Sequence, residues 1–314
     1  MMVNVMEELA KALQDIVGKE NISTAKPICE AYVTRGIMDI KSQAPAIVVR
    51  PKDVEEVRKI LLIANEKKIP VVPHSGGLSG GEATPTKKGS ILLDLRRMNK
   101  IVEVDTNARY MVVEPGVTSA QAWKFMQENH PDYRPGVPDG APPSATLVGD
   151  HLDRGFHFLS TRYGPAADAV LGLEAVLPTG EIIRTGSYAL PTSKGFYKWM
   201  FGPDLTGLFL GSQGTLGVVT KMAIKIFPMA KVRDVVAFGA SEWKYIIEPS
   251  LDVLKMEVVD LAQGGNYPLA TCRRAKYRWP PLPKPDALPM VWMNFELGTE
   301  TKEEMENIKR RINH

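Results

Sequence analysis

Residues 73–81 read Pro-His-Ser-Gly-Gly-Leu-Ser-Gly-Gly, a glycine-rich loop that directly follows a predicted β-strand. Glycines let successive backbone N–H groups turn inward as a concave nest, and they let a diphosphate approach the main chain closely. The loop lacks the Gly-Lys-Ser/Thr ending of a P-loop, and its glycines do not follow the Gly-x-Gly-x-x-Gly spacing. From these residues alone, two interpretations stay open: a phosphate-binding loop and a simple connecting loop.

The chain before this loop predicts a strand, a helix and a second strand. Residues 46–49 form an apolar run typical of a buried strand, and Asp53 followed by Glu56 has the spacing of a capping box for a helix to about residue 68. Residues 69–72 predict the strand that leads into the loop. Further upstream, apolar residues at helical spacing predict an amphipathic helix within residues 1–20, and the chain then reads as irregular to residue 43.

The chain after the loop predicts mostly short strands. Thr118 and Gln121 have capping-box spacing for a helix to about residue 129, and residues 131–144 form a Pro- and Gly-rich segment typical of a functional loop. Pro178-Thr179-Gly180 predicts a hairpin turn. The predicted strands are 90–94, 101–104, 110–114, 170–177, 181–184 and 218–227.

A new pattern begins near residue 229, where we place a domain boundary. Residues 232–238 and 289–295 predict strands, while residues 241–255 and 301–312 predict helices, so the order is strand, helix, strand, helix. A polar, Pro-rich insert covers residues 263–285. No internal repeat is visible.

Composition describes an ordinary globular protein that carries no electrostatic signal for nucleic acid. The 314 residues include 39 Lys+Arg and 36 Asp+Glu, a net charge of +3, and 44% are hydrophobic. A basic face able to neutralise phosphates would need a larger excess of positive charge. The two cysteines, Cys29 and Cys272, lie far apart, so we expect neither a disulfide framework nor a thiolate metal site. With no signal peptide or membrane span visible in the sequence, we expect a cytoplasmic protein.

Four further segments occur in an order that indicates a family resemblance. They are Pro-Gly-Val at 115–117, Gly-Asp-His-Leu-Asp-Arg-Gly at 149–155, the stretch 173–186, and the stretch from Gly-Leu-Phe at 207–209 to residue 222. In this order they resemble flavoproteins of the vanillyl-alcohol oxidase and p-cresol methylhydroxylase family, over about residues 45–230. Leu-Asp-Arg-Gly and Gly-Leu-Phe resemble the phenol-oxidising branch. Residues 211–217, Gly-Ser-Gln-Gly-Thr-Leu-Gly, look more like the branch that oxidises D-2-hydroxy acids such as lactate and glycolate.

The resemblance implies an α+β fold in two parts. Residues 1–229 would form a two-subdomain FAD-binding domain of the vanillyl-alcohol oxidase type, with a helix in residues 1–20 as its lead-in. Residues 230–314 would begin an α+β substrate domain built on an antiparallel sheet. Because the chain is shorter than is usual for the family, we expect this second domain to be truncated or to be completed by another chain.

The resemblance also implies which residues hold FAD. The glycine loop would bind the pyrophosphate through its main-chain N–H groups, a second set would line the flavin with its ribityl and phosphate parts, and a third would pack near the adenine. The glycine-loop set is Pro73, Ser75, Gly76, Gly77, Leu78, Ser79 and Gly80. The flavin set is Pro138, Asp139, Gly140, Ser144, Thr146, Gly149 and Asp150. The adenine set is Gly214, Gly217 and Val219.

Two residues are the candidates for catalysis. Asp139 lies in the irregular loop near the expected reactive face, as a base or a charge, and Arg154 would offset the negative charge that builds on a flavin accepting a hydride. The ordinary alternatives are a solvated aspartate and a surface ion pair, and Arg162 competes with Arg154 for the same role. His151 and His157 have no metal-ligand spacing, so we expect no metal site.

Two more residues carry an alternative each. His74 could approach the flavin or be a histidine hydrogen-bonded within the loop. Glu174, in an apolar strand, is a buried functional acid or a structurally paired one.

The function implied is an FAD-dependent oxidoreductase that takes a hydride from a small alcohol, a 2-hydroxy acid or a para-alkylphenol to flavin N5 and passes the electrons to a second acceptor. Phenol oxidisers of the family carry a tyrosine where this chain has Ser79, which weakens the case for a phenol. The alternative is a flavin-holding subunit, incomplete by itself, in a hetero-oligomeric enzyme. The partners expected are a small-molecule substrate, an electron acceptor, other subunits in an oligomer and a chain that completes the substrate domain.

Overall fold

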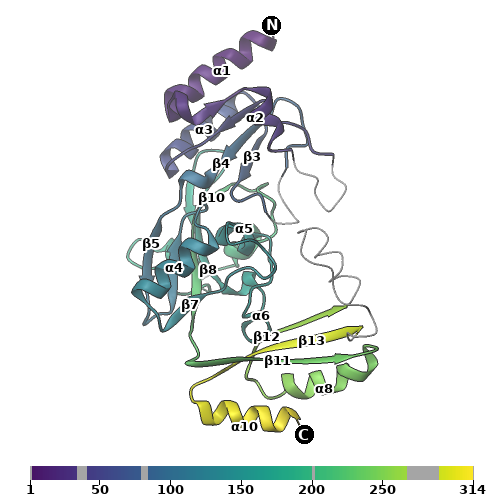
Figure 1. The fold of residues 1–314 in the computed structure, drawn as a ribbon. Coiled ribbons are helices and arrows are strands. Elements are labelled where there is room, and N and C mark those ends of the chain that lie inside the picture. The colour runs from purple at the N-terminus through teal and green to yellow at the C-terminus, as the bar shows by residue number, and fades with distance from the viewer. Residues whose placement is uncertain (1, 34–40, 79–83, 200–201, 267–289, 314) are drawn as a thin grey trace. The chain divides into compact units, whose positions relative to one another are not determined.

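The computed structural model describes residues 2–33, 41–78, 84–199, 202–266 and 290–313 (Figure 1). The chain divides into two compact units. The first unit comprises Met1–His157 and Pro165–Phe227, and the second comprises Phe158–Gly164 and Pro228–His314. None of the helices in the described ranges has both the length and the apolar character that crossing a membrane requires.

The first unit begins with a four-stranded sheet flanked by helices. Its strands, in order across the sheet, are β1 (Ile22–Ser23), β2 (Ile47–Val49), β4 (Ile91–Asp94) and β3 (Val71–His74). Strands β2, β4 and β3 run parallel, and β1 adds to the edge antiparallel. The accompanying helices are α1 (Met2–Val17), α2 (Lys26–Glu30) and α3 (Val54–Glu66). Strand β3 is therefore a sheet edge, and its carboxyl end delivers the glycine loop.

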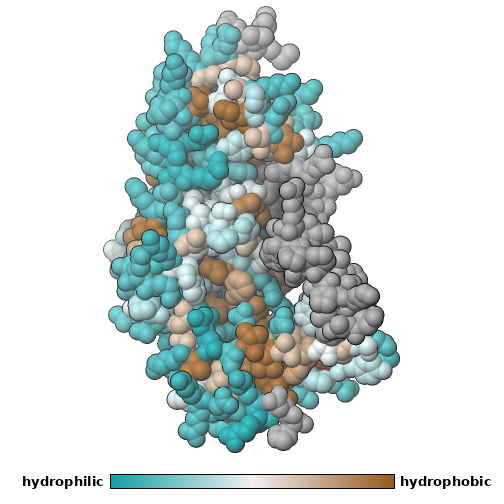
Figure 2. Space-filling view, viewed as in Figure 1, coloured by the Kyte–Doolittle hydropathy of each residue, from teal (hydrophilic) through white to brown (hydrophobic). Residues whose placement is uncertain are grey.

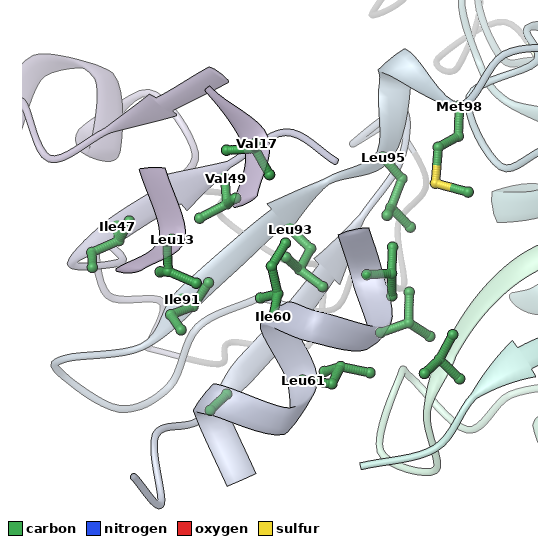
Figure 3. Close-up of a cluster of buried hydrophobic side chains, with 14 of the residues drawn as sticks. Leu13, Val17, Ile47, Val49, Ile60, Leu61, Ile91, Leu93, Leu95 and Met98 are labelled. Carbon is green, nitrogen blue, oxygen red and sulfur yellow. The ribbon is translucent and has the colours of Figure 1, made fainter. Parts of the chain in front are cut away.

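Apolar side chains from the sheet and from two helices make the core of this first part. Leu13 of α1 and Ile60 of α3 pack with Ile47, Ile91 and Leu93 of the parallel strands, and all five are completely buried (Figure 3). Helix α3 begins where the sequence predicted, because the backbone N–H of Glu56 donates to Asp53 Oδ1 at 2.9 Å. The core thus fixes the strand ends from which the loop departs.

The second sheet of the first unit is antiparallel. Its main path runs β5 (Ile101–Asp105), β6 (Tyr110–Val113), β10 (Val218–Pro228), β8 (Val170–Val176) and β9 (Ile182–Arg184), with β7 (Tyr133–Pro135) also paired to β10. Strands β8 and β9 form the predicted hairpin. The helices of this part are α4 (Ser119–Asn129), α5 (Leu147–Leu152) and α7 (Leu205–Phe209). Helix α4 carries the expected capping box of Thr118 and Gln121.

The second unit is a three-stranded antiparallel sheet with helices. Its strands are β11 (Val232–Ala240), β13 (Val291–Thr299) and β12 (Val259–Asn266), in that order, and its helices are α6 (Ser160–Tyr163), α8 (Lys244–Leu254) and α10 (Lys302–Asn313). The predicted α+β fold, with an antiparallel sheet after residue 229, is confirmed. The strand, helix, strand, helix order was incomplete, because β12 follows α8 in a stretch where no strand was predicted, and only its last four residues fall in the predicted insert 263–285.

Candidate functional site

Two separate segments of the first unit meet at the start of the glycine loop. Ser75 Oγ lies 2.9 Å from Thr146 Oγ1, so a hydroxyl pair joins the loop to the residue that precedes helix α5. A Cβ built on Gly76 would lie 3.2 Å from the Thr146 backbone nitrogen, and one on Gly149 would lie 3.0 Å from Ser75 Oγ. Both glycines therefore sit where added side-chain atoms would crowd their neighbours. We call Ser75, Gly76, Thr146 and Gly149 the cradle.

Gly77 and Leu78 follow the cradle in the loop. Gly77 has a φ of +63° and packs against the ring of His74, with a hypothetical Cβ 2.6 Å from its Nε2, and Leu78 is 44% exposed. The left-handed conformation and the close ring contact together favour glycine at position 77. Ser79 and Gly80, predicted to bind the pyrophosphate, lie outside the described residues.

Asp150 lies on helix α5, next to Gly149, and is half-buried, with its Oδ2 atom screened from water. A Cβ on Gly155 would collide with its Oδ1, and among the described residues its buried Oδ2 has no hydrogen-bond partner. Burial, assisted by repulsion from the Asp153 carboxylate, raises the pKa of Asp150 to about 7. A buried carboxyl of this kind exchanges a proton near neutral pH.

The turn after helix α7 contacts both the end of α5 and the start of the glycine loop. Gly214, with a φ of +72°, approaches Pro73 so closely that a Cβ would lie 2.5 Å from the proline Cγ. Gly211 packs under the guanidinium of Arg154, and the Gln213 amide donates to Asp153 Oδ1 at 2.9 Å. Pro73, Arg154 and Gly214 are thereby held around one turn.

Gly217 and Val219 lie at the start of β10, beside β8. A Cβ on Gly217 would lie 2.6 Å from the carbonyl oxygen of Val176, and buried Val219 pairs with Ala175 in the antiparallel register. The close backbone approach explains the glycine at 217.

The loop with Asp139 is organised by other contacts. The Asp139 backbone N–H donates to the Phe156 carbonyl at 2.9 Å, and Pro138 forms a β-bridge with His157. Asp139 is half-buried, while Gly140 and Ser144, also predicted to line the cofactor, are exposed. The contacts that order this loop are thus distinct from those of the cradle.

Sequence reasoning missed a charged group at the carboxyl ends of the parallel strands. Buried Asp94, at the end of β4, accepts from the Tyr32 hydroxyl at 2.7 Å and pairs with Arg96, whose Nη2 lies 2.6 Å from its Oδ2. These bonds hold the pKa of Asp94 below its usual value in spite of burial. His74 packs edge-on against Tyr32, with 5.2 Å between ring centroids, and burial lowers its pKa. Tyr32 lies 62 residues before Asp94, so no local pattern in the sequence links these two residues.

Two other sequence candidates have partners that explain them. Arg162, within the second unit, bonds to buried Asp260 at 3.1 Å. Glu174 on β8 is 1% exposed and binds Lys221 at 2.9 Å and Arg184 at 2.8 Å. The paired alternative for each residue is therefore what the geometry shows.

Two buried histidines complete the surroundings of α5. His151 is fully buried and its Nδ1 lies 2.8 Å from the Leu147 carbonyl oxygen, while His157 packs against Phe227. Burial lowers the pKa of each histidine to about 4, so both are neutral at pH 7. Within the described ranges, no cluster of three His, Cys, Asp or Glu side chains is arranged to hold a metal ion.

Comparison with known proteins places this geometry in a family. An FAD-binding domain model matches residues 45–186. The flavoprotein subunit of 4-cresol dehydrogenase (hydroxylating) from Pseudomonas putida is 33% identical over 264 residues, covering 81% of this chain and 47% of the relative. The glycolate oxidase subunit GlcD of Bacillus subtilis is 31% identical, covering 73% of this chain and 47% of the relative. The chain thus spans about half the length of these curated relatives.

The fold comparison agrees with the sequence comparison. The structure of p-cresol methylhydroxylase with substrate bound matches 98% of this chain and 63% of its own, with a TM-score of 0.80 and 26% identity. The resemblance read from the ordered motifs is confirmed. Residues 45–186 form an FAD-binding domain, and the chain belongs to the family of FAD-linked oxidoreductases that includes the flavoprotein of p-cresol methylhydroxylase.

Proposed function

We propose that this chain is the FAD-holding part of an oxidoreductase that removes a hydride from a small alcohol. The observation that carries the proposal is the cradle, where a Cβ on Gly76 or Gly149 would fill space against Thr146 and Ser75. A second observation is the buried Oδ2 of Asp150, which lacks a partner among the described residues. Bare backbone and an unsatisfied polar atom side by side fit a polar cofactor.

We assign binding roles to this chain's residues from the cradle together with the family resemblance. The backbone N–H groups of Ser75, Gly76 and Gly77 bind the pyrophosphate, with Ser79 and Gly80 continuing the loop. Thr146, Gly149 and Asp150 line the ribityl and flavin parts together with Pro138, Gly140 and Ser144. Pro73, Leu78, Gly214, Gly217 and Val219 complete the remaining walls. Residues 1–229 then form the FAD-binding domain, and residues 230–314 begin the substrate domain.

Bound FAD supplies a two-electron acceptor for the substrate hydride. The chain's own residues must accept the proton of the substrate hydroxyl and offset the negative charge that develops on the cofactor. We assign the Asp139 carboxylate as the base that takes the substrate hydroxyl proton, since the loop that holds it is fixed through Phe156. We assign Arg154, whose guanidinium packs over Gly211, as the positive charge that offsets the negative charge developing on the cofactor.

The substrate we propose is a 2-hydroxy acid such as D-lactate or glycolate, or a para-alkylphenol, with the electrons going to a second acceptor. Two relatives support these two substrate classes, because one is described as a cresol dehydrogenase flavoprotein subunit and the other as a glycolate oxidase subunit. Ser79 favours the hydroxy acid, because the phenol-oxidising branch carries a tyrosine at that position.

The test is an absorption spectrum of the purified chain followed by anaerobic reduction. We expect flavin absorption near ~450 nm, restored by added FAD if the protein is purified colourless. Bleaching by D-lactate or glycolate, but not by p-cresol, would assign the hydroxy acid. A chain that stays colourless after incubation with FAD would refute the proposal.

A second candidate is supported by the description of the cresol dehydrogenase relative as a flavoprotein subunit. Here this chain holds FAD, and a partner polypeptide completes the substrate side. The yellow chain would then resist reduction by all three substrates until a co-purified partner is added. Reduction of the isolated chain would refute this second candidate.

A further inference from the structure

The binding role proposed above for Asp150 does not say which protonation state of its carboxyl binds the cofactor. It follows Gly149 of the cradle on helix α5, and its Oδ1 lies against the Cα of Gly155, where no side chain fits. Its Oδ2 is screened from water and, among the described residues, has no hydrogen-bond partner. An ionised carboxylate here would leave Oδ2 with neither hydration nor a donor, which disfavours the charged form.

The charged groups around Asp150 do not compensate for this cost. Burial raises the pKa of Asp150 to about 7, and the carboxyl of Asp153, one turn on, adds to this effect by repelling a negative charge. His151 cannot supply a positive charge near neutral pH, because burial lowers its pKa to about 4. The Arg154 guanidinium instead packs over Gly211, across the turn. A neutral carboxyl is therefore the form that this pocket favours in slightly acidic solution.

A neutral carboxyl differs from a carboxylate because it can donate a hydrogen bond. We infer that Asp150, in its protonated form, donates a hydrogen bond from its unpartnered oxygen to an acceptor atom of bound FAD and so positions the cofactor beside the cradle. The inference rests on the proposed binding of FAD. It adds that deprotonation of Asp150 opposes FAD binding, because it removes the hydrogen-bond donor and places a negative charge beside an anionic ligand.

The test measures the dissociation constant of FAD for the cofactor-free 314-residue chain between pH 6 and pH 8.5, by quenching of flavin fluorescence. If only protonated Asp150 binds well, the apparent dissociation constant rises about 30-fold over this range, because the binding-competent fraction falls tenfold for each pH unit above the pKa. Asp150→Asn retains a donor that does not titrate, so we expect its dissociation constant to stay within about twofold. Asp150→Ala has no donor and should bind weakly at every pH.

Asp168→Asn is the matched control. It removes a carboxylate from an exposed position of the same unit, and it should reproduce the wild-type pH profile. Circular dichroism confirms that each variant is folded, and Asp150→Asn carries the test if Asp150→Ala is not. Wild-type affinity that is independent of pH, or Asp150→Asn that keeps the wild-type slope, overturns the inference and leaves FAD binding intact. A wild-type chain that binds no FAD at any pH refutes the proposed function itself.

Discussion

Glu174 offers the sharpest test of how the FAD-binding unit is held together. Its carboxylate is 1% exposed and lies between Lys221 Nζ, at 2.9 Å, and the Arg184 guanidinium, at 2.8 Å, with the Thr220 hydroxyl donating at 3.1 Å. Glu174→Gln keeps the shape and the hydroxyl bond but leaves two cations without their anion. The side chains of Lys221 and Arg184 are 22% and 44% exposed, so both recover part of their hydration.

The expected loss follows from that exposure. Removing one partner of a fully buried ion pair costs about 3–5 kcal/mol, and partial rehydration of the two cations reduces this to about 2–3 kcal/mol at pH 7. For a unit of this size the loss lowers the melting temperature by roughly 5–10 °C. Thermal unfolding followed by circular dichroism measures it, with Glu181→Gln in the exposed hairpin turn as the control that should change little.

The pH dependence separates pairing from other causes. The cations hold the pKa of Glu174 below its usual value, although burial acts in the opposite direction. The stabilisation is thus present above the unfolded-state pKa near 4.5 and is lost as the pH falls through the lower folded-state value. The gap between wild type and Glu174→Gln should narrow below pH 4.5. An equal melting temperature at pH 7, or a gap that does not narrow in acid, would refute the reasoning, and an altered flavin spectrum without lost stability would point to a functional acid.

Three further outcomes are expected. Gly149→Ala places a Cβ 2.9 Å from Thr146 Oγ1, and this crowding should weaken FAD binding by about 1–3 kcal/mol. Fluorescence titration should then show a dissociation constant roughly 5- to 150-fold higher, whereas an unchanged affinity would show that the cradle is not part of the binding site. Burial lowers the pKa of His151 to about 4 in the folded state, against about 6.5 in the unfolded chain, so the free energy of unfolding falls by up to about 3 kcal/mol as the pH drops from 6.5 to 4. Urea unfolding of His151→Gln should show a smaller decrease in stability over this pH range, and a decrease equal to that of the wild type contradicts the assignment. Gly186→Ala combines a φ of +64° with a collision at the Leu171 carbonyl, so the urea midpoint should drop sharply, and a near-neutral result would mean that the turn rearranges.

Local signals in the sequence predicted helices well and missed structure that depends on distant contacts. Asp53, Thr118 and Thr301 each accept from a backbone N–H three residues later, and such caps need only neighbouring residues. Strand β12 was missed because its polar and glycine-rich run becomes a strand by pairing with β13, about thirty residues further along the chain. Helix α5 is only six residues long, too short for a periodic pattern to reveal.

The same division holds for the candidate site. The glycine loop was visible because its composition is local, yet its contact with Thr146 spans 71 residues and was indicated only by family resemblance. The hydrogen bond from the Tyr32 hydroxyl to Asp94 spans 62 residues and has no signature in the sequence. The raised pKa of Asp150 arises from burial, which an isolated aspartate in a sequence does not reveal.

The assignment of Phe158–Gly164 to the second unit makes that unit discontinuous in the gene. The chain leaves the first unit after His157, returns at Pro165 and leaves again after Phe227. The Thr161 hydroxyl accepts from the Ala262 backbone N–H at 2.9 Å, and Arg162 holds Asp260, so this short excursion supplies part of the second unit's own packing. Exchanging the second unit between relatives at a single crossover near residue 228 would separate those partners. An exchange of the second unit therefore needs either two matched segments or coordinated change at both.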